Sequence, residues 1–413
     1  MQTHERYDVV IAGGGLVGMT LGVALAGAGL SVAVVDAQPQ PDRLEEAYDG
    51  RASAIAHGSA RVFDGIGLAP HLAEYMSPIW DIRVVDGHPL RGISPLFLHY
   101  DHTEIGAGPF GYIIENRHIR QALAARAAEI DNLTLIAPAR IAQCDRGPLR
   151  VGITLSDGRA LEAAVVIGCE GRKSPLREAA GIGLARWDYG QTSIVCTVTH
   201  ELPHAGVAVE LFLPTGPFAM LPMIADRSNV VWSESHARAR MLMALPDDAF
   251  LAELTSRFGA WLGEITLTGP RFAYPLSLQH AQRYTDRRLA LAGDAAHGMH
   301  PIAGQGFNLG VRDVAALAET LVDAHRLGLD LGSDGVLEGY ERRRRFDNQL
   351  LLAVTDGLTR LFSNDIGPLR LARDLGMAAI NRVGPLKPLK HFLMRHAMGL
   401  VGDLPRLIRG EKL

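Results

Sequence analysis

Three glycines near the N-terminus, Gly13, Gly15 and Gly18, have the spacing G-x-G-x-x-G between a short apolar strand and a helix. In such a turn the first glycine allows a tight bend, the second lets a pyrophosphate approach the backbone, and the third lets the helix pack on the strand. The amides at the helix start, with the positive end of the helix dipole, attract phosphate. Asp36 ends the next expected strand, where a carboxylate can accept from a ribose diol. The pattern predicts a dinucleotide site but does not separate NAD from FAD.

A second group of residues that could bind a ligand or take part in a reaction lies near position 290. The expected strand 288–292 is followed by the pattern G-D-A-A-H-x-x-x-P-x-x-G-Q-G-x-N-x-G-x-x-D, which contains Asp294, His297, Pro301, Gly304, Gln305, Gly306, Asn308 and Asp313. An aspartate at a strand end can bind the hydroxyls of a polyol. The glycine-rich turn exposes backbone amides at the start of a helix expected near Asn308, and such amides can hold partial negative charge on a flat heteroaromatic ring.

A third pattern runs from Val165 to Arg177, where a buried strand leads into a polar turn and a helix start. In this order, the three motifs resemble those of the group A flavoprotein monooxygenases, the para-hydroxybenzoate hydroxylase class. Within that class the chain is most similar to the ubiquinone-biosynthesis hydroxylases of the UbiH/UbiF type. The closer similarity rests on residues 111–116, 212–222, 274–276, 337–347 and 397–399, and the resemblance covers nearly the whole chain.

The resemblance implies FAD as the cofactor, with NAD(P)H as a transient reductant. It places the adenosine half at Gly13, Gly15, Gly18 and Asp36, and the ribityl chain or pyrophosphate at Asp294. It places Pro301, Gly304, Gln305, Gly306 and Asn308 against the isoalloxazine, Arg51 near the flavin and pyrophosphate, and Asn116 at a polar FAD contact. The chain departs from the family at Glu170, where the family has aspartate; the extra methylene keeps the charge but shifts the carboxylate relative to FAD or nicotinamide.

The function that the resemblance implies is hydroxylation of the aromatic ring of a polyprenylated phenol in ubiquinone biosynthesis, with O2 and a C4a-hydroperoxyflavin. Three alternatives stay open: hydroxylation of another phenol, a flavin reductase or dehydrogenase on the same scaffold, and a non-catalytic subunit. The sequence identifies no catalytic base. His297, Tyr189 and Tyr274 are candidates, and each is more often a structural hydrogen-bonding residue.

The expected strands and helices around these motifs indicate an α/β fold. We expect a discontinuous Rossmann-like FAD-binding domain (1–75, 100–178 and 279–355), an inserted β-sheet substrate domain (76–99 and 179–278) and a C-terminal helical segment (356–413). Strands are expected at 195–198, 207–212, 219–223 and 229–232. The substrate would lie at the interface between the two domains, the usual place for a pocket.

Composition narrows the function classes. The net charge is −4, so the chain is not built to bind nucleic acid. Its three cysteines form no C-x-x-C pair, which argues against a disulfide framework or a thiolate zinc site. We expect no metal at Asp294, His297 and His300, because they flank a Pro/Gly loop with no further Cys/His cluster. Residues 9–35 carry no charge, but the glycine break predicts a buried strand–helix–strand unit rather than a membrane span.

The C-terminal stretch is basic, with 14 Lys/Arg against 7 Asp/Glu from Glu341 to Leu413. Six residues follow helical spacing with basic residues between them: Leu386, Leu389, Phe392, Leu393, His396 and Leu400. Such a helix can rest on anionic lipid, which would suit an apolar substrate. The alternative, which we favour, is a helix packed on its own domain or on a partner subunit. We therefore expect a cytoplasmic protein, with binding to the inner face of the membrane as the alternative.

Overall fold

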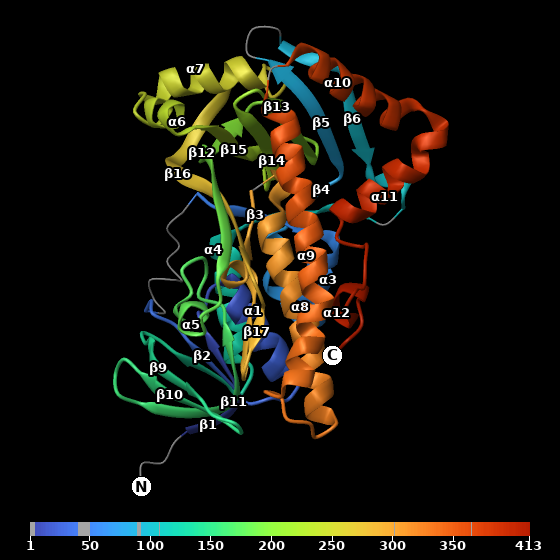
Figure 1. The fold of residues 1–413 in the computed structure, drawn as a ribbon. Helices are drawn as coiled ribbons and strands as arrows, with labels where there is room; N and C mark the ends of the chain where they lie inside the picture. The colour runs from blue at the N-terminus through green and yellow to red at the C-terminus, as the bar shows by residue number, and fades with distance from the viewer. Residues whose placement is uncertain (1–4, 40–49, 89–91, 107, 301, 365) are drawn as a thin grey trace.

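The structure is a computed structural model that describes residues 5–39, 50–88, 92–106, 108–300, 302–364 and 366–413. Two large sheets lie one above the other in Figure 1, and the helices α8 (Gln305–Arg326) and α9 (Asp334–Phe362) run along the molecule beside them. The predicted fold class is confirmed: a Rossmann-like α/β unit carries a second, β-sheet unit and a helical C-terminal segment.

The first sheet has the strand order β17-β18-β11-β1-β2-β8, and β9 and β10 extend it beside β11. Its strands are β1 (Glu5–Ala12), β2 (Val32–Val35), β8 (Leu133–Ile136), β9 (Ile141–Arg146), β10 (Val151–Leu155), β11 (Ala160–Gly168), β17 (Thr285–Asp286) and β18 (Leu289–Leu291). The strands β18, β11, β1, β2 and β8 run parallel. The strands β2 and β18 and the C-terminal halves of β1 and β11 are buried on both faces, so they are continuous apolar runs rather than alternating ones.

The uncharged stretch 9–35 forms the expected unit of β1, α1 (Leu16–Gly27) and β2. Residues 9–12 and 18–26 are buried inside the protein, which explains the absence of charge. Among the helices that the structure describes, none is both long enough and apolar enough to cross a bilayer.

The second sheet has the order β19-β16-β12-β15-β14-β13-β5-β6. Its strands are β5 (Asp81–His88), β6 (Gly92–Asp101), β12 (Leu184–His200), β13 (Val207–Leu213), β14 (Gly216–Met223), β15 (Arg227–Ser235), β16 (Ile265–Ala281) and β19 (His297–Gly298). One face packs an apolar cluster against α6 (His236–Met243) and α7 (Asp247–Phe258). We call the opposite face the inner face, because it contacts the C-terminal helices and the loop before α8.

The remaining elements connect or cover these sheets. They are β3 (Ala52–Ala56), β4 (Ser77–Ile79) and β7 (Gly111–Glu115), which form a small third sheet, and the helices α3 (His57–Gly65), α4 (Asn116–Ala128), α5 (Pro175–Ala179), α10 (Gly367–Arg382), α11 (Lys387–Ala397) and α12 (Arg406–Arg409).

Two elements differ from expectation. The helix expected near Asn308 begins at Gln305, because Gly304 adopts a left-handed conformation (φ +61°) and ends the preceding loop there. In the C-terminal segment, α11 packs through Lys390, Met394 and Met398, whereas Leu389 and Phe392 of the predicted apolar face are exposed. Lys390 can be buried because its ammonium pairs with Glu104 at 2.5 Å.

Candidate cofactor and active site

The three sequence motifs meet at one edge of the first sheet. The glycine turn 13–18 follows β1, Asp36 follows β2, Glu170 follows β11 and Asp294 follows β18. These four strands are neighbours and parallel, so their carboxyl ends share one edge. Ligands of open α/β sheets bind at this edge.

Each glycine of the first motif occupies a distinct environment. A Cβ on Gly13 (φ +95°) would lie 2.5 Å from the carbonyl oxygen of Cys169, and a Cβ on Gly18 would lie 1.9 Å from the carbonyl oxygen of Gly13. These two positions therefore need glycine for packing. A Cβ on Gly15 would meet no protein atom within 4 Å. Gly15 is also the N-cap of α1 and offers no side chain to bond the first helical amides, so this open space suits a phosphate.

Asp36 lies directly beside the glycine turn. Its carboxylate accepts from the amide of Gly14 at 2.5 Å and from the amide of Gln38 at 2.7 Å. Only 7% of the side chain is exposed. The carboxylate is therefore fixed at the end of β2, next to the open space at Gly15.

Asp294 lies between the buried residues Gly293 and Ala295, yet it is itself exposed. Burial raises the pKa of Asp294, and the nearby positive charges of Arg172 and His297 oppose that rise. Gln279 donates to the backbone carbonyl of Asp294 at 2.8 Å, and no described residue donates to its carboxylate. Such a group fits a hydroxyl-rich ligand that would donate to it.

The start of α8 is held against β3. Asn308 donates to the carbonyls of Ala54 and Gly304 and accepts from the amide of Ala56 at 2.8 Å. The side chain of Asn308 therefore has a structural role in fixing the turn 304–308. A Cβ on Gly306 would meet no protein atom within 4 Å, which leaves room for a flat ring above the backbone.

Arg51 and Asn116 are brought together by backbone pairing. The amide of Asn116 donates to the carbonyl of Arg51 at 2.9 Å, and Ser53 donates to the side-chain oxygen of Asn116 at 2.6 Å. The Arg51 side chain is exposed at the start of β3, on the strand that holds the α8 turn. Pro301, the remaining predicted contact, lies outside the described residues.

Glu170, where the chain departs from the family pattern, caps α5. Its carboxylate accepts from the Ser174 hydroxyl at 2.5 Å and from the amide of Leu176 at 3.3 Å. Burial raises its pKa, and the hydrogen bond from Ser174 opposes the rise. Arg177, buried in the same motif, donates to the carbonyl of Ala295 at 3.0 Å and thereby ties this turn to the Asp294 loop.

Asp313 is the centre of a buried network behind the site. It pairs with His297 on one side and with Arg344 at 2.9 Å on the other, and Asn348 donates to it at 3.2 Å. Burial works against its ionisation, but the charges of His297 and Arg344 hold the pKa of Asp313 well below its usual range. His297 is thus engaged with a structural partner rather than directed at a substrate.

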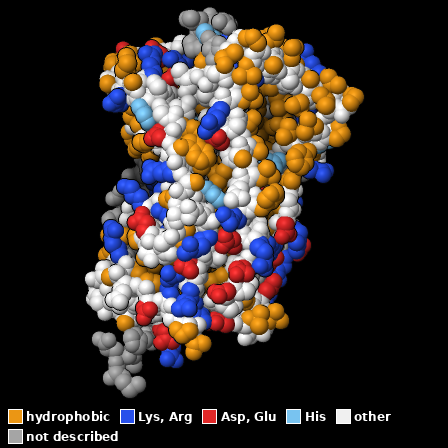
Figure 2. Space-filling model, in the orientation of Figure 1, with side chains coloured by type: hydrophobic (Ala, Val, Ile, Leu, Met, Phe, Trp, Pro, Cys, Tyr) orange, Lys and Arg blue, Asp and Glu red, His pale blue; other side chains and the backbone are white. Residues whose placement is uncertain are grey.

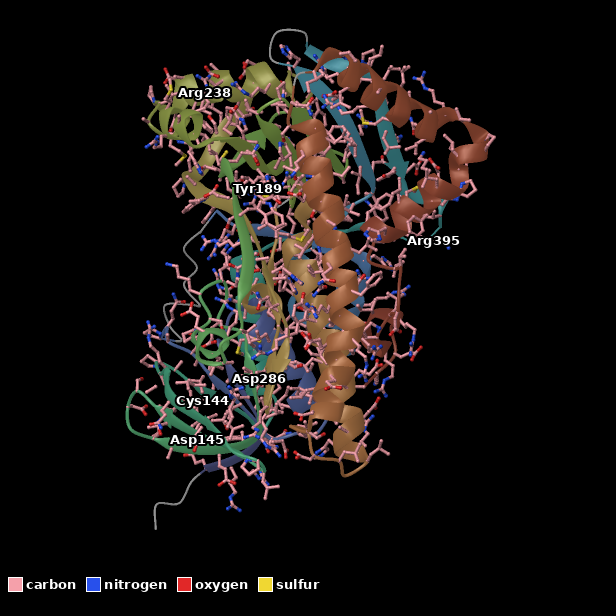
Figure 3. The ribbon with its side chains drawn as sticks, in the orientation of Figure 1. Cys144, Asp145, Tyr189, Arg238, Asp286 and Arg395 are labelled. Atoms are coloured by element: carbon pink, nitrogen blue, oxygen red, sulfur yellow. The ribbon has the colours of Figure 1, made fainter. Side chains whose placement is uncertain are left out.

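The other two base candidates lie on the second sheet. Tyr189, labelled in Figure 3, lies on β12 beside α9, and its ring meets that of the fully buried His300 edge-on at 5.0 Å. Burial raises the pKa of Tyr189, which keeps its hydroxyl protonated at neutral pH, so it has no ionised oxygen to accept a proton. Tyr274 on β16 pairs in register with Ser193 and is half-buried.

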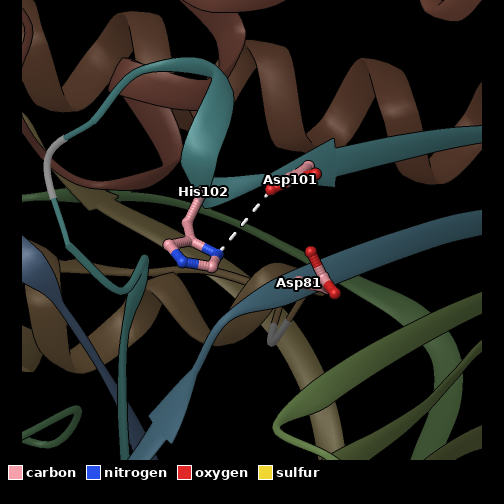
Figure 4. A group of neighbouring side chains, drawn as sticks. All are labelled: Asp81, Asp101 and His102. Atoms are coloured by element: carbon pink, nitrogen blue, oxygen red, sulfur yellow. Dashed lines mark ion pairs between the residues drawn. The ribbon is translucent and has the colours of Figure 1, made fainter.

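Asp81, Asp101 and His102 form the one group among the described residues whose ligand atoms lie close enough to hold a metal (Figure 4). Asp101 already accepts from the amide and hydroxyl of Thr103, and the His102 ring contacts the Trp80 carbonyl at 3.0 Å. These bonds complete a turn after β6, and the group lies apart from the three motifs.

The residues at the sheet edge fit FAD. Gly15 provides open space at a helix N-terminus, Asp36 and Asp294 provide carboxylates at two strand ends, and Gly306 leaves room beside the α8 start. A dinucleotide with a flat ring system matches these features, because its phosphates can bind at the helix start, its hydroxyls at the carboxylates and its ring beside the start of α8.

Comparison with known proteins agrees with this geometry. Residues 6–353 match the FAD binding domain family. The chain is 54% identical over 409 residues to the ubiquinone hydroxylase UbiL of Rhodospirillum rubrum, covering 98% of this chain and 93% of that protein. It is 34% identical over 405 residues to the 3-demethoxyubiquinol 3-hydroxylase of Escherichia coli, covering 96% and 100%.

Among solved structures, the p-nitrophenol 4-monooxygenase PnpA from Pseudomonas putida has the same fold, with a TM-score of 0.78 over 97% of this chain and 99% of that one at 19% identity. The chain therefore belongs to the FAD-binding flavoprotein family that includes the ubiquinone hydroxylases, and FAD is its cofactor.

Proposed function

We propose that this chain hydroxylates the aromatic ring of a prenylated phenol in ubiquinone biosynthesis, with FAD, NAD(P)H and O2. The observation that carries the proposal is the match over 98% of the chain to a ubiquinone hydroxylase. The inner face of the second sheet supports it, because apolar side chains line it from the α8 loop to the C-terminal helices.

The residues predicted to hold FAD have separate tasks in this proposal. Gly15 and the start of α1 would bind the pyrophosphate, Asp36 a ribose, Asp294 the ribityl hydroxyls, and the backbone 304–308 the ring. FAD held by these residues would supply the redox chemistry, namely acceptance of a hydride from NAD(P)H and activation of O2. The apolar side chains of the inner face would exclude water and hold the substrate ring in place.

Membrane-surface contact is a second part of the proposal. The helices α9, α10 and α11 expose an apolar surface that consists of Phe346, Leu350, Val354, Leu358, Leu361, Ile366, Leu371, Leu375, Val383, Leu389 and Phe392. Figure 2 shows hydrophobic side chains gathered over α10, α11 and the end of α9 beside them. Exposed patches of this extent mark interaction sites, and the exposed Arg382, Lys387 and Arg395 nearby favour anionic lipid.

Complementation tests the activity. Bacterial strains that each lack one ring-hydroxylation step of ubiquinone synthesis receive the gene, and mass spectrometry identifies the quinone intermediates. We expect restored ubiquinone in at least one strain. Rescue of none, together with NAD(P)H oxidation by the purified protein without oxygen insertion, would favour a flavin reductase instead.

Vesicle flotation tests the membrane contact. We expect the protein to float with phosphatidylglycerol vesicles and the double variant Leu371→Ser/Phe392→Ser to remain at the bottom. Leu327→Ser is the control, because Leu327 is 74% exposed but follows α8, outside the apolar surface. Equal flotation of all three proteins would remove this part of the proposal.

A further inference from the structure

Glu210 is the only charged residue of β13, whose sequence is VAVELFL. Side chains alternate along a strand, so Glu210 shares a face with Ala208 and Phe212. Leu211 and Leu213 belong to the cluster under α6 and α7. Ala208 and Phe212 belong to the clusters of the inner face. The carboxyl group therefore points from the inner face, toward the α8 loop and the C-terminal helices.

The surroundings of Glu210 are apolar. Its partners in register are Val84 on β5 and Ala219 on β14. The cluster at Phe212 includes Ile302, which lies two residues before Gly304, and Phe362 at the end of α9. Glu210 thus lies on the sheet face between the loop predicted to contact the isoalloxazine and the helices of the apolar surface.

No described residue pairs with the Glu210 carboxylate. Burial alone acts on it and raises its pKa to about 8. Its side chain nevertheless keeps some accessible surface, so it borders a space rather than filling the core. A carboxyl group without a partner in apolar surroundings costs free energy, and groups of this kind are concentrated at functional sites.

Tyr100 is a second polar group on this face. It pairs in register with Ile82, which pairs with Ala208, so the three side chains lie on the same side of the sheet. Tyr100 contacts both inner-face clusters, and burial raises its pKa to about 12. The inner face thus carries the Tyr100 hydroxyl and the Glu210 carboxyl group among apolar side chains. These two groups can hydrogen-bond the hydroxyl of a prenylated phenol, while the apolar side chains contact the rest of it.

We propose that Glu210 binds the phenolic hydroxyl of the substrate and acts as its proton acceptor, an inference that rests on the proposed function. The O–H bond of the phenol breaks, its electron pair stays on the phenolic oxygen, and the proton passes to a carboxylate oxygen of Glu210. The phenolate then supplies electron density to the ortho and para ring carbons. Glu210, now a neutral acid, returns the proton to the product oxygen, so the residue regenerates without net proton uptake.

Two variants of the FAD-loaded enzyme test this role. Glu210→Gln keeps the shape but cannot accept the proton, and Glu201→Gln changes an exposed glutamate after β12 as the control. The substrate is a phenol with a short prenyl chain, and hydroxylated product, NAD(P)H and hydrogen peroxide are measured together. We expect Glu210→Gln to retain FAD, to lower kcat/KM by about 10- to 100-fold and to divert reducing equivalents to peroxide. Glu201→Gln should behave as wild type.

A more acidic substrate shows whether Glu210→Gln loses activity through missing proton transfer or through altered packing of the pocket. A ring-fluorinated analogue of the same phenol ionises more readily and needs the acceptor less. We expect it to restore most of the lost rate of Glu210→Gln, which a variant with a merely damaged pocket would not show. An equal rate of wild type and Glu210→Gln on the parent phenol would overturn the inference.

Failure of the proposed function is distinguishable, because wild type itself would then make no hydroxylated product. Should Glu210→Gln not fold, Glu210→Asp replaces it, since it keeps an acid one methylene shorter. The rate ratio of fluorinated to parent phenol must then exceed that of wild type, and an unchanged ratio would contradict the role.

Discussion

Gly15 differs from Gly13 and Gly18 because the space beside its Cα is open to a ligand rather than filled by protein. Its φ of −65° suits alanine. We therefore expect Gly15→Ala to leave the thermal stability of the apoprotein unchanged but to weaken FAD binding by about 10- to 100-fold through overpacking. Flavin fluorescence titration measures the affinity. Gly27→Ala, at another uncrowded glycine of the same helix, is the matched control. Wild-type affinity in Gly15→Ala would place the pyrophosphate elsewhere.

His300 makes the fold sensitive to acid. It is fully buried, and burial lowers its pKa to about 4, whereas an unfolded histidine titrates near 6.5. The unfolded chain therefore binds the proton first, and stability falls as the pH drops from about 6.5 toward 4. At about 1.4 kcal/mol for each unit, the loss has an upper limit of about 3 kcal/mol.

Urea unfolding at pH 7 and pH 5 measures this effect. His300→Asn should lose less stability between the two pH values than wild type. His325→Asn, at an exposed histidine at the end of α8, should match wild type. An identical pH dependence in all three proteins would show that another group controls acid unfolding.

Residues of local motifs were predictable, whereas residues defined by distant contacts were not. The roles of the glycine turn follow from a spacing of six residues and its flanking elements. Arg177 reaches Ala295, 118 residues away, so no local pattern reveals its function. Glu210 left a weaker signal, as a single charge within an apolar strand, but only the sheet register shows which face it occupies.

Helices and strands were likewise predictable where local patterns define them and not where distant contacts do. The alternating and apolar runs predicted β12 to β15, although each strand proved longer. Strand β16 was missed, since its 17 residues include Gly269, Pro270 and Pro275, which normally interrupt strands. On α11, helical spacing indicated that the apolar face with Leu389 and Phe392 would be buried. Instead the helix packs through Lys390 and Met394, and the lysine can be buried because its ammonium pairs with Glu104.

Helix α10 is fixed to the second sheet by a buried ion pair. Arg373 donates to Asp86 on β5 at 2.8 Å, and both side chains are at least 98% buried. We expect Asp86→Ala to destabilise the protein by about 3–5 kcal/mol, since it leaves the guanidinium buried without its charge partner. Urea unfolding measures the loss.

The double variant Asp86→Ala/Arg373→Met is the control for this pair. It removes both charges and keeps most of the side-chain volume, so it should recover much of the lost stability. The double variant Arg342→Met/Glu338→Ala, which breaks an exposed pair at 3.5 Å on α9, should cost less than about 1 kcal/mol. A similar small cost for Asp86→Ala would mean that α10 is held by apolar contacts alone.

At the scale of the whole molecule, FAD would join segments that the chain keeps far apart. Residues 13–18, 36, 294 and 304–308 come from both ends of the nucleotide-binding unit, and the second sheet is inserted between them. A ligand that binds only the folded state stabilises it by about 2.7 kcal/mol at 100 times its dissociation constant. We therefore expect the unfolding temperature to rise by several degrees when FAD is added to the apoprotein.

Asp294→Ala should remove most of this stabilisation and give nearly colourless protein, while the unfolding temperature without FAD changes little, because Asp294 is exposed. Asp145→Ala is the control: Asp145 is exposed on β9, away from α8 (Figure 3), and its FAD-dependent shift should equal that of wild type. Differential scanning calorimetry with and without FAD compares the three proteins. If Asp294→Ala keeps full yellow occupancy and the full shift, the glycine turn and the α8 loop suffice to hold the cofactor, and the ribityl contact must come from another residue.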